Sequence, residues 1–267
     1  MTVWLGTAGW SYKDWIGPFY PSGTAPGDML RSYAQRFRCV EVDSSFYSVP
    51  AKRTVEAWCK RVPMGFVFCP KFPKSISHDS FLLGCEQELT TFLERMSLLG
   101  GALGPMLLQF PYFNQKSGVD LAAFLARLEP FLDLLVEWML PHMRVVVEVR
   151  NRSFLRESLF AALRKRKVPL ALIDHAWMPS PDQQRQNKDM LTSDFVYLRL
   201  LGDRYGIEKL SKTWDRELVD QSWRISSWAD WVKELAQERT VFAFANNHFA
   251  GFAPASMQKL QQALEES

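Results

Sequence analysis

The sequence predicts an α/β protein: a single domain, residues 1–267, built as a (β/α)8 barrel with a core of eight parallel strands. Three observations predict this fold. Eight short apolar or β-branched runs recur along the chain, segments with helical spacing lie between most of them, and the runs are continuously hydrophobic rather than strictly alternating. Strands that are apolar on both faces need cover on both, as in a parallel sheet. Eight such units favour a closed TIM barrel over a doubly wound open sheet.

Each expected element has its own pattern. The strands are expected at 3–7, 39–43, 66–71, 106–110, 144–149, 170–174, 195–200 and 241–246. Apolar residues at helical spacing predict helices over 30–37, 89–96, 121–128 and 228–235. Pro130 lacks an amide donor, so the helical stretch after the fourth strand is expected to divide into two helices. The polar segments 177–193 and 202–221 are expected to be surface loops.

Composition limits the classes of partner. The formal charge of +3 is small for a dedicated nucleic-acid binder, and the basic run at 164–167 is interpreted as a solvated helix end. The four cysteines form no C-x-x-C pair and are expected to be reduced. No leader pattern or long apolar run occurs, which predicts a cytoplasmic protein without a membrane segment. The oligomeric state stays open.

Polar and charged residues stand at the ends of seven of the eight expected strands. In barrel enzymes the chemistry lies at the carboxyl ends of the strands, where the βα loops begin. These residues are Glu41, Asp43, Lys71, Gln109, Glu148, Arg150, Asp174, Arg199, Asn246, Asn247 and His248. Because side chains alternate along a strand, Glu148 and Arg150 point the same way, as do Glu41 and Asp43. Buried charges are costly unless paired or solvated, so these groups must meet one another, a ligand or water.

Two interpretations of the strand ends stay open. One is an internal salt-bridge lattice that caps the barrel core and performs no chemistry. The other is a site in which Lys71, Arg150 and Arg199 hold an anion while Glu148 carries a proton, with Glu41 or Asp174 as its counterpart. Gln109, Asn246 and Asn247 are then expected to bind substrate, although Gln109 and Asn247, like Asp43, can equally satisfy backbone groups at the strand ends.

Other candidates lie on the loops. His78 follows the third strand and can act as acid, base or ligand, or be an exposed histidine without a role. Trp10 is the residue of the first, aromatic loop expected to stack on substrate, whereas its neighbours are expected to pack onto the barrel. No clustered metal-ligand pattern or nucleotide motif occurs, so no metal site or cofactor is predicted. A single divalent ion held by Glu148 and Asp174 stays open.

Several motifs resemble the DUF72, or YecE-like, family of TIM-barrel proteins, and the resemblance covers nearly the whole chain. They are Gly6-Thr7-Ala8-Gly9-Trp10-Ser11-Tyr12, Phe19-Tyr20-Pro21, Val40-Glu41-Val42-Asp43-Ser44-Ser45-Phe46-Tyr47, Phe68-Cys69-Pro70-Lys71, Leu107-Leu108-Gln109-Phe110-Pro111, Val147-Glu148-Val149-Arg150, Val196-Tyr197-Leu198-Arg199 and Phe244-Ala245-Asn246-Asn247. The resemblance implies the barrel fold and supplies no activity. Tyr47, within these motifs, joins the expected substrate-binding residues. The chain departs from the family pattern at Asp43, Phe154 and Leu201, where asparagine, tryptophan and histidine are usual.

The preferred hypothesis is an enzyme that acts on a small anionic or phosphorylated substrate by acid/base chemistry at the barrel mouth. One alternative is a protein that binds or processes nucleic acid or nucleotides, with the mouth contacting phosphates. Another is a metabolite-binding protein without turnover. Sequence does not separate these three, because a fold by itself does not decide function.

Overall fold

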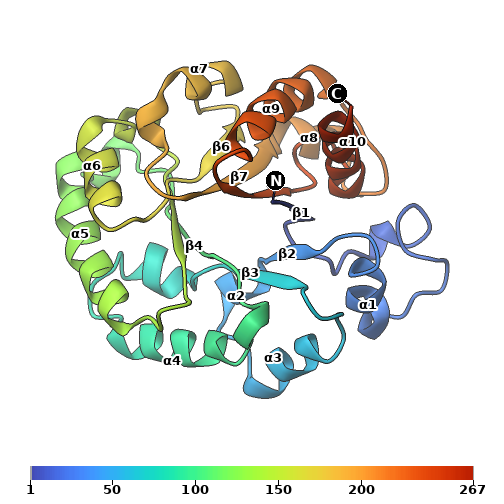
Figure 1. Ribbon diagram of the computed structural model, residues 1–267, viewed down its shortest axis with the longest axis horizontal. Helices are drawn as coiled ribbons and strands as arrows, with labels where there is room; N and C mark the ends of the chain where they lie inside the picture. Colours follow the sequence, from blue (N-terminus) through green and yellow to red (C-terminus); the bar gives the residue numbers. More distant parts are fainter. Residues whose placement is uncertain (1, 267) are drawn as a thin grey trace.

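Eight parallel strands form the centre of the molecule, and helices surround them (Figure 1). The computed structural model describes residues 2–266. The strands are β1 (Val3–Thr7), β2 (Cys39–Val42), β3 (Val67–Pro70), β4 (Met106–Gln109), β5 (Val145–Glu148), β6 (Leu172–His175), β7 (Phe195–Gly202) and β8 (Thr240–Ala245). Each lies within two residues of its expected position. The alternation of strand and helix that the sequence predicts is therefore confirmed.

The helices are as follows. They are α1 (Met29–Tyr33), α2 (Ser44–Tyr47), α3 (Lys52–Cys59), α4 (Glu86–Ser97), α5 (Leu121–Trp138), α6 (Glu157–Lys165), α7 (Pro181–Gln186), α8 (Arg204–Leu210), α9 (Ser222–Leu235) and α10 (Ala253–Glu265). Among residues 2–266, no helix combines the length and apolar character needed to span a bilayer.

The strands close into a ring. Ladders join β2 to β3, β4 to β5, and β6, β7, β8 and β1 in series, all of them parallel. Isolated parallel bridges join the remaining neighbours: Ala8 with Glu41, Lys71 with Leu107, and Val147 with Leu170. Parallel strands around a full circle bring all eight carboxyl ends to one rim. The predicted barrel fold is confirmed.

The interior of the barrel is apolar in its middle and charged at the carboxyl ends of the strands. Cys39, Cys69, Leu107, Val146, Tyr197 and Phe244 belong to one buried cluster inside the ring. Two residues further along the same strands stand Glu41, Lys71, Gln109, Glu148, Arg199 and Asn246. Side chains two apart on a strand share a face, so this polar layer lies directly above the apolar one.

The predicted division of the helix at Pro130 is wrong, because α5 runs unbroken from Leu121 to Trp138. An interior proline costs about 3 kcal/mol. Against this, α5 buries Phe124, Leu128, Phe131, Leu132 and Leu135 against the barrel. Five such side chains contribute on the order of 10 kcal/mol, so tertiary packing outweighs the local penalty.

The two segments expected to be loops contain helices. α7 lies within 177–193, and its capping box joins Ser180 and Gln183, a sequence signal that the loop prediction overlooked. α8 lies within 202–221.

The basic run at 164–167 also differs from expectation. α6 does end there, at Lys165. The Arg166 side chain, however, is buried and forms ion pairs with Asp133 and Glu129 of α5, so the run is not a fully solvated patch.

Replacing Pro130 by alanine is expected to raise the free energy of unfolding by about 1–3 kcal/mol, because alanine restores an amide donor within α5. Urea denaturation at neutral pH measures the change. Leu128→Ala, in the same helix, is the contrasting variant and is expected to lower stability by about 2–5 kcal/mol. A Pro130→Ala variant less stable than the parent chain contradicts this account of α5.

Candidate functional site

A cavity of about 470 Å³ opens at the carboxyl ends of the strands. Its lining comes from β2, β3, β4, β5, β6, β7 and β8 and the loops that follow them. The lining residues are Asp43, Phe46, Lys71, His78, Gln109, Pro111, Tyr112, Arg150, His175, Trp177, Arg199, Leu201, Asp203, Arg204, Tyr205, Asn246 and His248. Its size falls within the range of small-molecule sites. We call it the mouth cavity.

Arg199 of β7 forms the floor of the mouth cavity by joining two carboxylates from other strands. Its Nε and Nη2 donate to the two oxygens of Glu41, at 2.8 and 2.5 Å. Its Nη1 donates to Oε2 of Glu148 at 2.6 Å. The Tyr197 hydroxyl donates to Glu41 at 2.9 Å. Both glutamates are fully buried, and neither lines the cavity.

The pKa values of the two glutamates move in opposite directions. Burial raises the pKa of Glu41 above its ordinary range, against the lowering effect of Arg199. Burial also acts to raise the pKa of Glu148, but Arg150 and Arg199 outweigh it and hold that pKa at about 2. Glu148 is therefore a permanent anion at neutral pH. Such a group positions cations well and transfers protons poorly.

Arg150 lines the mouth cavity, and its side chain is 19% exposed. Its Nε donates to Oε1 of Glu148 at 2.5 Å, which fixes the orientation of the group. Among residues 2–266, its two terminal nitrogens form no hydrogen bond. The sequence places Arg150 two residues after Glu148, and the structure shows the common direction expected for that spacing.

Lys71, directly after β3, is a second cation of the cavity lining. Its ammonium group is 3.1 Å from Oδ1 of Asp43 and 4.6 Å from the centre of the Phe46 ring. Ser45 links β2 to the end of β3. Its hydroxyl accepts a hydrogen bond from the Lys71 amide at 3.0 Å and donates one to the Val42 carbonyl at 2.7 Å. Lys71 is thus paired yet still lines the cavity.

Three of the four histidines of the chain line the mouth cavity. His78 lies in a π-helical turn, Ser75–Asp79, and burial together with Lys71 lowers its pKa to about 4. Burial, aided by Arg150, lowers the pKa of His175. Burial lowers that of His248, although Glu208 acts in the opposite direction. All three rings are therefore predominantly neutral at pH 7.

Hydrogen bonds assign different tautomers to two of these rings. Nδ1 of His175 accepts the Trp177 amide at 3.2 Å, so Nε2 carries the proton of the neutral ring. Nε2 of His248 lies 3.1 Å from Oε1 of Glu208 and must donate to that carboxylate, which leaves Nδ1 as the basic nitrogen. Gly202, with φ of +66°, lets the end of β7 approach His248 closely.

Two amides complete the lining. Oδ1 of Asn246 is buried and accepts no hydrogen bond from any residue between 2 and 266. Gln109 donates to the Phe110 carbonyl at 3.3 Å. The structure therefore gathers six of the predicted site residues on the cavity surface: His78, Lys71, Gln109, Arg150, Arg199 and Asn246.

Asp174 does not belong with them, and its expected role as the counterpart of Glu148 is withdrawn. It shares its strand face with Leu172, which packs outward against the helices. Its carboxylate binds Arg224 at 2.6 Å and Nε1 of Trp228 at 2.6 Å, both on α9. Glu148 and Asp174 thus face opposite sides of the barrel wall and do not suit a shared divalent ion. Among residues 2–266, no cluster of three or more histidine, cysteine or acidic ligands occurs.

Three further expected residues lie outside the cavity lining. Trp10 packs edge-on against Trp58 at 5.6 Å, so its expected stacking role is not supported. Tyr47 is 74% exposed on α2, away from the lining. Asn247 is buried and accepts the Ala253 amide at 3.0 Å, a contact that caps α10.

Sequence reasoning missed several lining residues. His175, Tyr112 and Trp177 each follow an expected strand, but they lie one to three positions beyond its expected end. The signal that could have identified them is the presence of aromatic and imidazole side chains in the first few positions after each strand. Tyr205 and Arg204 belong to α8, which was expected to be loop.

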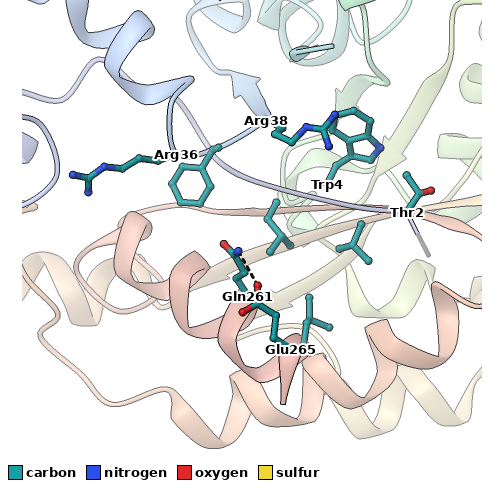
Figure 2. A pocket seen from close by; sticks show the side chains of 10 residues that line it. Thr2, Trp4, Arg36, Arg38, Gln261 and Glu265 are labelled. Carbon is teal, nitrogen blue, oxygen red and sulfur yellow. Dashed lines mark hydrogen bonds between the residues drawn. The ribbon is translucent and has the colours of Figure 1, made fainter. Parts of the chain in front are cut away.

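A second cavity, of about 580 Å³, lies at the other end of the barrel, between β1, α10 and the segment before β2 (Figure 2). The Arg38 guanidinium stacks on Trp4 at 5.1 Å, and that of Arg36 stacks on Phe19 at 4.8 Å. Figure 2 shows Arg36 directed away from Trp4. Although this cavity is larger, its charged groups do not converge, so we assign the site to the mouth cavity.

The comparisons with known proteins agree with this architecture. A family model described as "Protein of unknown function DUF72" matches residues 4–267. The chain belongs to the DUF72 family. The UPF0759 protein YecE of Escherichia coli K12 is 28% identical over 286 residues, which cover 99% of this DUF72 chain and 93% of YecE. The UPF0759 protein YunF of Bacillus subtilis is 38% identical over 69 residues, 26% of this chain and 23% of YunF.

Solved structures support the fold of this DUF72 chain. A DUF72 family protein from Thermotoga maritima has a TM-score of 0.77 at 24% identity, with 100% of both chains covered. A D-psicose 3-epimerase from Clostridium cellulolyticum has a TM-score of 0.55 at 8% identity, covering 98% of this chain and 96% of that one. At these identities the likeness concerns the fold alone.

Glu148→Gln is expected to lower the free energy of unfolding at neutral pH by about 3 kcal/mol, from a pKa of about 2 against an ordinary 4.5. Because folding lowers this pKa, the stabilisation is complete above pH 4.5 and is lost as the pH falls toward 2. Urea denaturation at pH 7 and pH 3 measures it, with exposed Glu137→Gln as control. If Glu148→Gln and the parent chain lose the same free energy of unfolding between pH 7 and pH 3, the low pKa assigned to Glu148 is wrong.

Proposed function

We propose that the mouth cavity binds a small anionic or phosphorylated metabolite of the cytoplasm and transforms it by acid/base catalysis. The observation that carries this proposal is Arg150: Glu148 binds its Nε, its two terminal nitrogens form no hydrogen bond with residues 2–266, and it lines a cavity of ligand size. A planar guanidinium with two available nitrogens matches the oxygens of a phosphate or carboxylate.

The positions of the charges around the cavity support an anionic ligand, whereas the small net charge of the chain does not. Lys71, Arg150, Arg199 and Arg204 line it, with Asp43 and Asp203 as the acidic members. Glu41 and Glu148 lie beneath the floor, bound to Arg199. Each carboxylate below thus orients a cation above it. An anion in the cavity meets positive groups first, and the low local dielectric strengthens that contact.

The proton transfers fall to the histidines in this proposal, in place of Glu148. His248 serves as general base through Nδ1, because Glu208 accepts the hydrogen on its Nε2. His175 serves as hydrogen-bond donor through Nε2, because its Nδ1 accepts a hydrogen bond from the Trp177 amide. His248 takes a proton from the substrate and, once protonated, returns it, while the N–H of neutral His175 stabilises the negative charge that develops on the substrate. His78 is a further neutral imidazole beside Lys71.

Arg150→Met is expected to weaken binding of inorganic phosphate and glycerol phosphate at least tenfold, because it removes two charge-assisted hydrogen bonds. Isothermal titration calorimetry measures the affinities. Arg152→Met is the matched control, since Arg152 is two residues away and exposed, and contacts Gln183 at 3.4 Å. Binding that is unchanged in Arg150→Met, or absent from the parent chain for every anion in a metabolite panel, overturns the proposal.

His248→Gln is expected to lower kcat for a ligand found in that panel by about 100- to 10,000-fold, with little change in affinity. Turnover is followed by proton NMR with the purified protein. His142→Gln, which changes the exposed histidine outside the cavity, is expected to match the parent chain. Ligand binding without turnover in the parent chain instead indicates a metabolite-binding protein without catalysis.

A further inference from the structure

Three large aromatic side chains stand half in solvent along one side of the mouth cavity. Tyr112 is 52% exposed, Trp177 is 51% exposed and Tyr205 is 64% exposed, and all three line the cavity. They come from different segments: the chain after β4, the turn after β6 and the first turn of α8. We call the three residues the aromatic shelf.

The members of the shelf contact one another. The rings of Tyr112 and Trp177 have their centres 5.6 Å apart, and those of Trp177 and Tyr205 are 6.4 Å apart. The His175 ring packs edge-on against Trp177 at 5.2 Å. Trp177 is therefore held between neighbours, and its environment restricts the orientations that its ring can adopt. A ring fixed before binding loses little entropy when a ligand stacks on it.

Burial does not account for the shelf. Trp15, Trp228 and Trp231 are completely buried and stabilise the fold through the area they bury. The shelf residues instead leave about half of each ring in water beside a polar cavity. Exposed aromatic faces that converge from separate segments on one cavity are typical of a surface that receives another ring.

The shelf and the cationic floor bound the same cavity. Arg150 lies two residues after β5, whose neighbours in the ring are β4 and β6, and these two strands lead into Tyr112 and Trp177. Arg204 precedes Tyr205 on α8 and also lines the cavity. A ligand that fills the space thus meets a guanidinium with one part and aromatic faces with another.

We infer that the ligand of this site carries a flat aromatic ring joined to its anionic group, with the size and chemistry of a nucleoside monophosphate. The ring stacks on Trp177, and the phosphate binds Arg150. This inference rests on the proposed function for the anion and adds the ring. The cavity volume of about 470 Å³ suits a ligand of that size.

Adenosine 5′-monophosphate, ribose 5-phosphate and inorganic phosphate are the probes that separate the ring from the anion. In the parent chain, adenosine monophosphate is expected to bind at least tenfold more tightly than ribose 5-phosphate. Trp177→Ala is expected to weaken the binding of adenosine monophosphate about 5- to 150-fold, which corresponds to the loss of one stacking partner. The affinity for ribose 5-phosphate is expected to stay unchanged. Isothermal titration calorimetry measures each affinity.

Two further variants sharpen the comparison. Trp177→Phe keeps an aromatic face and is expected to retain most of the preference for the ring. Trp223→Ala removes a tryptophan that is 57% exposed on α9, stacks with Arg224 and lies outside the cavity, and it is expected to behave as the parent chain.

The outcomes distinguish this inference from the proposed function. Equal affinity for adenosine monophosphate and ribose 5-phosphate, both dependent on Arg150, overturns the aromatic class of ligand and keeps the anion site. Trp177→Ala that weakens all three probes alike also overturns the stacking role. If none of the three binds while another anion of the panel does so through Arg150, the inference fails alone. If no anion binds, both fail.

Discussion

The ion pairs of Arg199 are the constraint on which the upper half of this barrel depends. One guanidinium from β7 binds carboxylates from β2 and β5, and all three groups are buried. Each of these charges is costly to bury alone, and breaking such a pair typically costs about 3–5 kcal/mol. The three strands must therefore come together with these side chains in one arrangement. That requirement makes the floor of the mouth cavity rigid.

The rigid floor divides the site into two kinds of residue. Glu41 and Glu148 are covered and hold Arg199 and Arg150 in place, and in the proposed function they would act on a ligand only through these two cations. The histidines, Asn246 and the aromatic side chains come from strand ends and loops and touch the cavity itself. The salt-bridge lattice and the proposed binding site, which the sequence presents as alternatives, form two layers of one structure. A fixed lower layer lets the upper one present groups with defined orientations.

Local patterns were reliable where they agreed with tertiary packing. Apolar strands were placed within two residues, because continuous β-branched and apolar runs in this chain become buried on both faces. Pro130 shows the reverse case, since the apolar stripe of α5 outweighs the local preference of one residue. Ser180 and Gln183 show a third case. They form a capping box within a polar segment, and this local signal starts α7.

The sequence by itself determined the barrel, the polar layer at its carboxyl end and the shared direction of Glu148 and Arg150, because these follow from a period of two along each strand. Only the tertiary structure decided that Asp174 faces α9, where Arg224 and Trp228 bind it. It also decided which histidines meet in one cavity and which aromatic side chains remain exposed there. The reason is physical: those outcomes depend on how strands and loops far apart in the chain are placed around the ring, and no local spacing encodes that placement.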